Sequence, residues 1–165
     1  MLIIITGTPG TGKSTLAVAL AQQRGWKRID LHEHYPALAL SYDKQKQCYD
    51  LDQKAFVKLL KEKVKGGKDL ILDSHVGHLL PANMVGLCVV LVCSDLKKLK
   101  KRLEKRGYAT AKVRENLDTE IFQVCLMEAK EHGHTVVVFD TGMMSTKEIL
   151  GKILRTLAGN LTKSL

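Results

Sequence analysis

Unbroken apolar runs alternate along this chain with stretches in which apolar residues return every three or four positions. The runs cover residues 2–5, 70–72, 87–93 and 135–139, and a shorter one covers 28–31. Because polar residues do not interrupt them, these runs predict strands covered on both faces, as in a parallel sheet. Helical spacing is present at residues 16–21, 56–64, 96–103, 121–129 and 149–157. Strand followed by helix, five times over, predicts a doubly wound α/β domain.

Several predicted helix boundaries have a local cause. Gly66 and Gly67 follow the helix that begins near Gln53, and Gly107 follows a strongly basic helix. Glycine is favoured just after a helix because it adopts the left-handed backbone conformation. Ser145 and Glu148 have the spacing of a capping box, so we expect the last helix to begin there.

Two segments fit the alternation of strand and helix poorly. Residues 30–52 are polar, rich in His and Tyr, and long for a connection, and residues 107–117 follow a cluster of cations. Long insertions at the ligand end of an α/β sheet are commonly lids or binding loops. We therefore expect both segments to take part in ligand binding.

The length and composition indicate one globular domain. The chain has 165 residues, of which 45% are hydrophobic and 26% charged. This length suits a single core and is too short for two ordinary domains. The balance of apolar and charged residues excludes a disordered or fibrous chain.

The charge and the cysteines indicate a cytoplasmic protein that attracts polyanions. Lys and Arg outnumber Asp and Glu by 26 to 17, a net charge of +9. Such a surface attracts nucleotide phosphates, RNA or acidic protein tails. Four cysteines without zinc spacing predict reduced thiols. The apolar run at 85–93 is far shorter than the roughly 20 residues of a membrane span, so no membrane contact is expected.

The strongest chemical signal is the glycine loop Gly7-Thr-Pro-Gly-Thr-Gly-Lys-Ser14, which follows an apolar strand and precedes a helix. Gly10 and Gly12 let backbone N–H groups converge on phosphate oxygens, and the helix N-terminus adds a partial positive charge. Lys13 is expected to reach the β and γ phosphates, and the Ser14 hydroxyl to ligate Mg²⁺. The alternative is a glycine-rich turn that contains Lys and Ser by chance. The guanine signature Asn-Lys-x-Asp is absent, which favours adenine nucleotides.

Asp73 closes the apolar run at 70–72 and is the candidate carboxylate for the magnesium shell. It could instead cap a turn. His75 could orient a water molecule or contact the γ phosphate, or it could be an ordinary satisfied histidine. The other histidines form no Cys/His ligand set, so no zinc site is expected.

Residues 97–106 contain seven Lys and Arg, with Leu96, Leu99 and Leu103 as the buried stripe. A solvated helix face would account for most of the lysines. Arg102 and Arg106 are one helical turn apart and share a face next to residue 107, where their guanidinium groups could close over a phosphoryl group in transfer. Phosphoryl transfer depends mainly on positioning and charge neutralisation.

With these motifs the chain resembles the atypical adenylate kinase family of archaea and eukaryotic nuclei. The matching pieces are residues 6–15 (TGTPGTGKST), Asp73-x-His75 with Pro81 beyond it, residues 102–108 (RLEKRGY), and Asn116 followed by residues 120–124 (EIFQV). The phosphate loop alone is common to many NTPases. The Asp-x-His and Arg-Gly-Tyr pieces discriminate much better.

The resemblance implies a P-loop NTPase fold of the nucleoside monophosphate kinase type, with a five-stranded parallel sheet flanked by helices, as one domain over residues 1–165. It places a monophosphate-binding region at 30–52, where Lys44 and Lys46 are the strong cations, and a short lid at 107–117. It assigns ATP contacts to Gly10, Gly12, Lys13, Ser14, Thr15 and Arg106. Asp73 and His75 become the motif that supports magnesium-dependent transfer and ATP hydrolysis.

Two functions of different classes remain open from the sequence. The first is an adenylate kinase that converts ATP and AMP to two ADP, with accompanying ATPase activity and Mg²⁺ as cofactor. The second is an ATP-dependent assembly factor that binds a small-subunit ribosomal protein or ribosomal RNA, with the kinase activity incidental. A third and weaker hypothesis is RNA binding through residues 97–106. Bases stack on aromatic side chains, and Tyr108 is the single aromatic residue beside that basic run.

Overall fold

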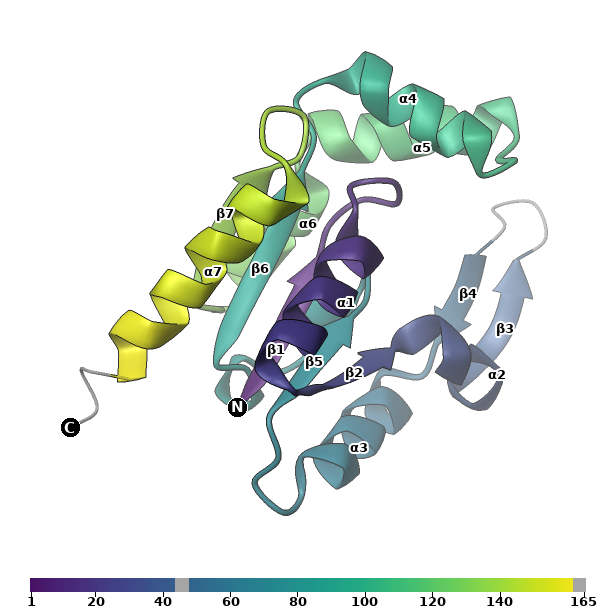
Figure 1. The fold of residues 1–165 in the computed structure, drawn as a ribbon. Helices are drawn as coiled ribbons and strands as arrows, with labels where there is room; N and C mark the ends of the chain where they lie inside the picture. Colours follow the sequence, from purple (N-terminus) through teal and green to yellow (C-terminus); the bar gives the residue numbers. More distant parts are fainter. Residues whose placement is uncertain (44–47, 162–165) are drawn as a thin grey trace.

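A parallel β-sheet forms the centre of the computed structural model, which describes residues 1–43 and 48–161. Within these residues five strands lie in the order β2-β5-β1-β6-β7 (Figure 1). The strands are β1 (Leu2–Thr6), β2 (Lys27–Asp30), β5 (Leu70–Asp73), β6 (Leu87–Val92) and β7 (Val136–Asp140). Each lies within a residue or two of an apolar run, so the predicted fold class is confirmed.

The two faces of the sheet explain why the apolar runs are unbroken. Ile3 and Ile5 of β1 pack on one face, against α1 (Lys13–Arg24) and α7 (Thr146–Leu161). Leu2 and Ile4 pack on the other face, against α3 (Gln53–Val64) and α6 (Val124–Glu131). The three isoleucines of β1 have no exposed surface. Burying one such side chain contributes about 2 kcal/mol.

Two further helices lie across the carboxyl ends of the strands (Figure 1). They are α4 (Leu96–Lys105) and α5 (Thr110–Ile121), and a small core of Cys93, Leu99, Leu103 and Val113 joins them to the sheet. Residues 107–117, the predicted lid, form the turn after α4 and the first part of α5. Much of this segment is therefore helix.

Residues 30–52 contain structure that the sequence analysis did not predict. A short 3-10 helix at Leu31–His34 leads into α2 (Tyr35–Leu38). The strands β3 (Ala39–Asp43) and β4 (Cys48–Leu51) then pair as an antiparallel hairpin. Lys44 and Lys46 lie outside the described residues.

Local signals at helix ends are confirmed in part. Ser145 Oγ accepts a hydrogen bond from the Glu148 amide at 3.3 Å, and the Glu148 carboxylate accepts one from the Ser145 amide at 2.8 Å, which completes the capping box. The prediction of continuous helical spacing over 121–129 was wrong. Gln123 adopts a left-handed φ of 51° and separates α5 from α6.

Two other expectations concern the thiols and the membrane. Cys88, Cys93 and Cys125 are free thiols, and the first two are buried. Among the described helices, none combines the length and the apolar character that spanning a membrane requires.

Candidate functional site

The glycine loop connects the end of β1 to the start of α1 at the carboxyl edge of the sheet. Gly7 has a φ of +139°, and a Cβ there would lie 2.2 Å from the Leu91 carbonyl oxygen, so no other residue fits. Gly12 has a φ of +94° and precedes the first residue of α1. Ligands bind at the carboxyl ends of strands in open α/β sheets. The loop thus has the backbone and the position that phosphate binding requires.

Lys13 is buried within this loop, and its Nζ donates a hydrogen bond to the Thr8 carbonyl at 3.0 Å. Burial lowers the pKa of Lys13 to about 8, although the charge of nearby Asp73 works in the opposite direction. A phosphate next to Nζ would stabilise the charged form. Ser14 and Thr15 follow on the first turn of α1.

Asp73 ends β5, is 3% exposed, and is paired with a residue that the sequence analysis missed. Arg28 donates from Nη2 and Nε to Asp73 Oδ2, at 2.6 and 3.2 Å. The same Nη2 also donates to Asp30. Burial disfavours the charged form of the guanidinium. The hydrogen bonds to Asp73 and Asp30 and the charges of these carboxylates outweigh the effect of burial, so the pKa of Arg28 is raised. The spacing of Arg28 and Asp30, two residues apart in a strand, was the available signal that they share a face.

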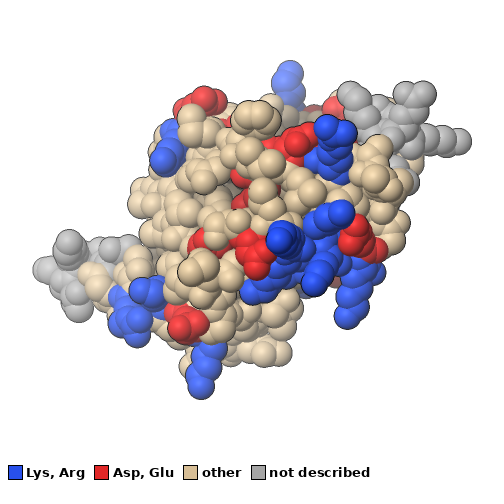
Figure 2. All heavy atoms as spheres, turned by 90° about the horizontal axis from the view of Figure 1, so that it is seen from above, with Lys and Arg blue, Asp and Glu red and all other residues tan. Residues whose placement is uncertain are grey.

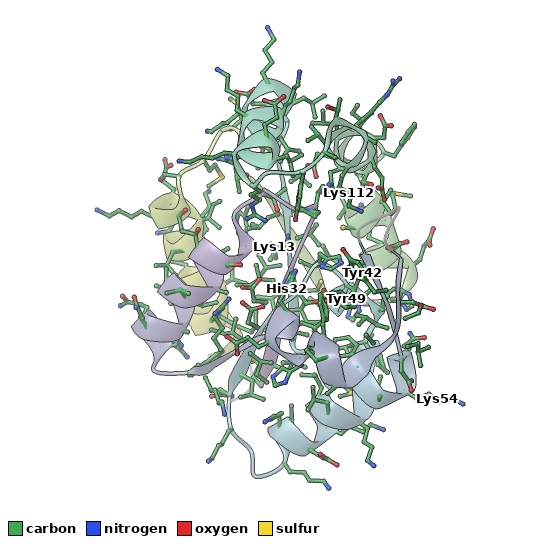
Figure 3. The ribbon with its side chains drawn as sticks, turned by 90° about the vertical axis from the view of Figure 1, so that its right-hand side faces the viewer. Lys13, His32, Tyr42, Tyr49, Lys54 and Lys112 are labelled. Carbon is green, nitrogen blue, oxygen red and sulfur yellow. The ribbon has the colours of Figure 1, made fainter. Side chains whose placement is uncertain are left out.

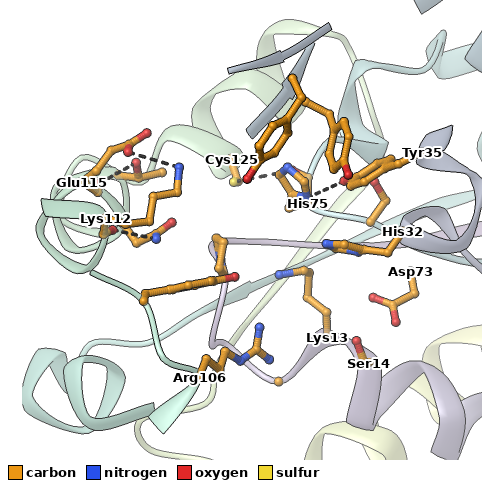
Figure 4. Close-up of a pocket in the computed structure, with 18 residues that line it drawn as sticks. Lys13, Ser14, His32, Tyr35, Asp73, His75, Arg106, Lys112, Glu115 and Cys125 are labelled. Atoms are coloured by element: carbon orange, nitrogen blue, oxygen red, sulfur yellow. Dashed lines mark hydrogen bonds and ion pairs between the residues drawn. The ribbon is translucent and has the colours of Figure 1, made fainter. Parts of the chain in front are cut away.

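His75 follows two residues later and lines the same cavity as Lys13 and Asp73 (Figure 4). Burial, together with the charge of Lys13, lowers the pKa of His75 to about 3. The Tyr35 hydroxyl lies 3.2 Å from His75 Nδ1. The structure therefore places His75 in the candidate site, where burial disfavours the charged form of its ring.

This first cavity has a volume of about 430 Å³ and contains six of the predicted residues. They are Gly12, Lys13, Ser14, Asp73, His75 and Arg106. Its opposite wall comes from α5, which supplies Lys112, Glu115 and Asn116. The cavity thus combines a basic, loop-side end with a polar helical wall.

Aromatic side chains form a further wall that the sequence analysis did not single out. Tyr35, Tyr42, Tyr49 and Tyr108 all line the cavity. The ring centroids of Tyr42 and Tyr49 are 4.8 Å apart, and those of Tyr35 and Tyr49 are 5.1 Å apart. In Figure 3, Tyr42 and Tyr49 lie near Lys13 and His32, whereas Lys54 lies well away from them. The Tyr-rich composition of residues 30–52 was the signal for this wall.

A second cavity, of about 570 Å³, lies on the other side of the loop. Gly10, Thr15 and Arg102 line it, together with residues 141 and 144–146. Gly12 and Arg106 line both cavities. The arrangement can therefore hold two ligands whose anionic ends meet near Gly12 and Arg106.

The two predicted arginines, Arg102 within α4 and Arg106 directly after it, are placed differently. Arg102 donates from Nη1 to the Gly10 carbonyl at 3.2 Å and to Thr141 Oγ1 at 3.4 Å, so it braces the glycine loop. Arg106 lines both cavities. The lysines of α4 are exposed, in agreement with the alternative that they form a solvated helix face. Basic side chains gather on the face of the molecule that Figure 2 shows from above.

Comparisons with known proteins match most of the chain. An AAA domain family model, AAA_18, matches residues 3–123. The chain is 33% identical over 158 residues to a protein of Pyrococcus furiosus named "Putative adenylate kinase", covering 95% of this chain and 84% of that protein. It is 36% identical over 156 residues to an "Adenylate kinase isoenzyme 6 homolog" of Schizosaccharomyces pombe, covering 93% and 87%.

Solved structures show the same fold at low sequence identity. Deoxyadenosine kinase from M. mycoides with bound dATP has a TM-score of 0.64 and 16% identity, covering 96% of this chain and 100% of that one. Shikimate kinase from Acinetobacter baumannii has a TM-score of 0.65 and 15% identity, covering 96% and 93%. These likenesses support the P-loop kinase fold.

Proposed function

This chain belongs to the AAA domain family AAA_18, and from that membership and the geometry of its site we propose that it transfers a phosphoryl group from ATP to a nucleoside monophosphate. AMP is the expected acceptor, because relatives at 33% and 36% identity are named as adenylate kinases. One observation carries the proposal: two cavities on either side of the glycine loop share Gly12 and Arg106. A kinase needs two ligands whose phosphates meet at one point.

In this proposal ATP lies along the second cavity, with its terminal phosphates on the glycine loop. Loop N–H groups and Lys13 neutralise the β and γ phosphates. Arg106, which directly follows α4, lines both cavities and stabilises the charge that develops during transfer. Arg102 keeps the loop in shape through its hydrogen bond to the Gly10 carbonyl.

The acceptor lies in the first cavity, with its base against the tyrosine wall and its phosphate toward Lys13. Aromatic side chains bind bases by stacking. An oxygen of the acceptor phosphate attacks the γ phosphorus, and the bond from that phosphorus to the β–γ bridging oxygen breaks. ADP leaves on the donor side, and the acceptor becomes a diphosphate. No protein nucleophile is required.

Mg²⁺ is the proposed cofactor, and the donor set fits it. Ser14 supplies a hydroxyl and Asp73 a carboxylate in the same cavity, and hard oxygen ligands suit this ion. The ion would neutralise phosphate charge when bound. The Asp73 carboxylate accepts its two Arg28 hydrogen bonds at Oδ2, and no described residue donates to Oδ1.

An acceptor panel tests the proposal. Purified protein with Mg·ATP is incubated with AMP, CMP, UMP, GMP or no acceptor, and nucleotides are separated chromatographically over time. We expect ADP to form fastest with AMP, and a slower release of phosphate without acceptor that measures ATPase activity. ADP formation that no monophosphate accelerates would contradict the kinase proposal.

The assembly-factor role stays a prediction from the resemblance. It requires that ATP and ADP favour different conformations. Pull-downs from a lysate with ATP, with ADP and without nucleotide test it, because equal recovery of ribosomal material in all three would contradict a nucleotide switch.

A further inference from the structure

Tyr35 and His75 are 40 residues apart in the chain but meet in the first cavity. Tyr35 is the first residue of α2, and His75 follows the end of β5. The Tyr35 hydroxyl oxygen lies 3.2 Å from His75 Nδ1 (Figure 4). This is a contact between the predicted acceptor segment and the predicted catalytic motif.

The Tyr35 ring is held in place by its neighbours. It is 5% exposed, and its centroid lies 5.1 Å from that of Tyr49 and 4.7 Å from that of His32. The His75 ring stands edge-on to it, at 88°. The packing around the ring therefore holds the hydroxyl facing His75.

The direction of this hydrogen bond decides what His75 presents to the cavity. Burial raises the pKa of the Tyr35 phenol, so the phenol keeps its proton and can act as a hydrogen-bond donor. If Nδ1 carried a proton and donated instead, the phenol proton would need another acceptor, and among residues 1–43 and 48–161 the Tyr35 hydroxyl makes no hydrogen bond other than the one with His75. Donation by the phenol satisfies both groups, and it requires an unprotonated Nδ1.

We propose that Tyr35 is a positioning residue, whose hydroxyl donates to His75 Nδ1 and holds the imidazole in the tautomer that carries its proton on Nε2. In this tautomer His75 presents an N–H donor to the cavity. His75 then acts as a hydrogen-bond donor to a phosphate oxygen, and not as a base that activates water. This last step rests on the proposed kinase function; the tautomer does not.

Nitrogen NMR of the nucleotide-free protein tests the tautomer directly. In protein with ¹⁵N-labelled histidine, two-bond correlations from the ring protons distinguish protonated from unprotonated nitrogens, and the His75→Gln spectrum assigns the His75 signals. We expect His75 to show an unprotonated Nδ1 and a protonated Nε2. A protonated Nδ1 would overturn the proposal.

The Tyr35→Phe variant keeps the ring and removes only the hydroxyl. We expect its His75 signals to move toward the average of the two tautomers. Tyr42→Phe is the matched control, because Tyr42 stacks on Tyr49 and makes no described contact with His75. Unchanged His75 signals in Tyr35→Phe, or equal changes in both variants, would overturn the role of Tyr35.

Kinetic measurements on Tyr35→Phe distinguish a role in positioning His75 from a purely structural role of Tyr35. Tyr35→Phe should lower kcat between about twofold and tenfold, the worth of one hydrogen bond, with an unchanged dissociation constant for ATP. A loss of ATP affinity with normal kcat would contradict the proposal.

Two substitutions of His75 test whether its Nε2–H acts as a hydrogen-bond donor, without any change at Tyr35. The amide of His75→Gln can reach the place of Nε2–H, whereas that of His75→Asn lies nearer Nδ1. We expect the Gln variant to keep several-fold more activity than the Asn variant, and equal or reversed activities would contradict the donor role. If wild-type protein transferred no phosphate, the kinase proposal would fail while the NMR result still decided the tautomer.

Discussion

The Arg28 guanidinium lies 2.6 Å from the Asp73 carboxylate, although 45 residues separate them in the chain. The sheet brings them together because β2 pairs with β5, with Asp30 opposite Asp73. Asp73 is almost completely buried, and a buried carboxylate is stable only when it is paired. The hydrogen bonds from Arg28 therefore fix the carboxylate of the candidate magnesium ligand at the edge of the cavity.

Replacing Arg28 tests this pairing. Arg28→Ala would leave the Asp73 carboxylate buried without its guanidinium, and we expect the free energy of unfolding to fall by about 2 kcal/mol. The side chain of Arg28 is 23% exposed, so solvent keeps the loss below that of a fully buried pair. Urea denaturation measures the change. The control is Arg114→Ala, because Arg114 is an exposed arginine on α5. An equal decrease in the free energy of unfolding in both variants would show that the Arg28–Asp73 pair contributes no more to stability than an exposed arginine does.

Lys13→Ala should abolish transfer and leave the fold intact. The Lys13 ammonium is the cation that the glycine loop places near the terminal phosphates, so we expect kcat to fall at least about a hundredfold. The Thr8 carbonyl that accepts from Lys13 also accepts from Thr11 Oγ1 at 2.8 Å, so no buried carbonyl is left unpaired. ADP formation and thermal melting together check the result. A variant with near-normal turnover would remove Lys13 from the mechanism.

Arg106 and Arg102 should differ in kinetic effect. Arg106 lines both cavities, so Arg106→Ala is expected to lower kcat by a factor of at least about 10 and to raise KM for both nucleotides. Arg102 lines the second cavity and braces Gly10, so Arg102→Ala should raise KM for ATP and leave KM for AMP unchanged. Steady-state kinetics with each substrate varied separately measure both. Lys101→Ala, on the exposed side of α4, serves as the control.

The capping box predicts a dependence of stability on pH. Hydrogen bonds from the Ser145 side chain and amide lower the pKa of Glu148 below its ordinary value of 4.5. A carboxylate whose pKa is lowered by folding stabilises the protein above its unfolded pKa, and this contribution disappears as the pH falls through the folded value. Ser145→Ala removes the hydrogen bond from the Ser145 hydroxyl to this carboxylate, and also the bond that Ser145 Oγ accepts from the Glu148 amide.

Melting curves of wild type and Ser145→Ala, recorded from about pH 7 to about pH 3, test this dependence. We expect the wild type to melt higher at neutral pH and the difference to narrow in acid, where only the bond from the Glu148 amide to Ser145 Oγ still separates the two proteins. A difference that stays constant over the whole range would show that Glu148 is not involved.

The sequence alone was sufficient for features that depend on neighbouring residues. The run at 2–5 predicted a strand with two buried faces, and Ile3 and Ile4 do pack on opposite faces. The spacing of the glycine loop predicted its turn, because a positive φ at Gly12 is a local requirement. Ser145 and Glu148 predicted a helix start for the same reason. These interactions form within a few residues, so their pattern is visible in the order of amino acids.

Tertiary structure decided which distant residues meet. The pairing of Arg28 with Asp73 follows from the placement of β2 beside β5, and that of Tyr35 with His75 from the fold that brings the first residue of α2 to the segment after β5. Neither contact has a signature in spacing, because strand order and register are set by packing of the whole core. For the same reason the sequence grouped Arg102 with Arg106, whereas the fold gave one a bracing contact and the other a place between two cavities.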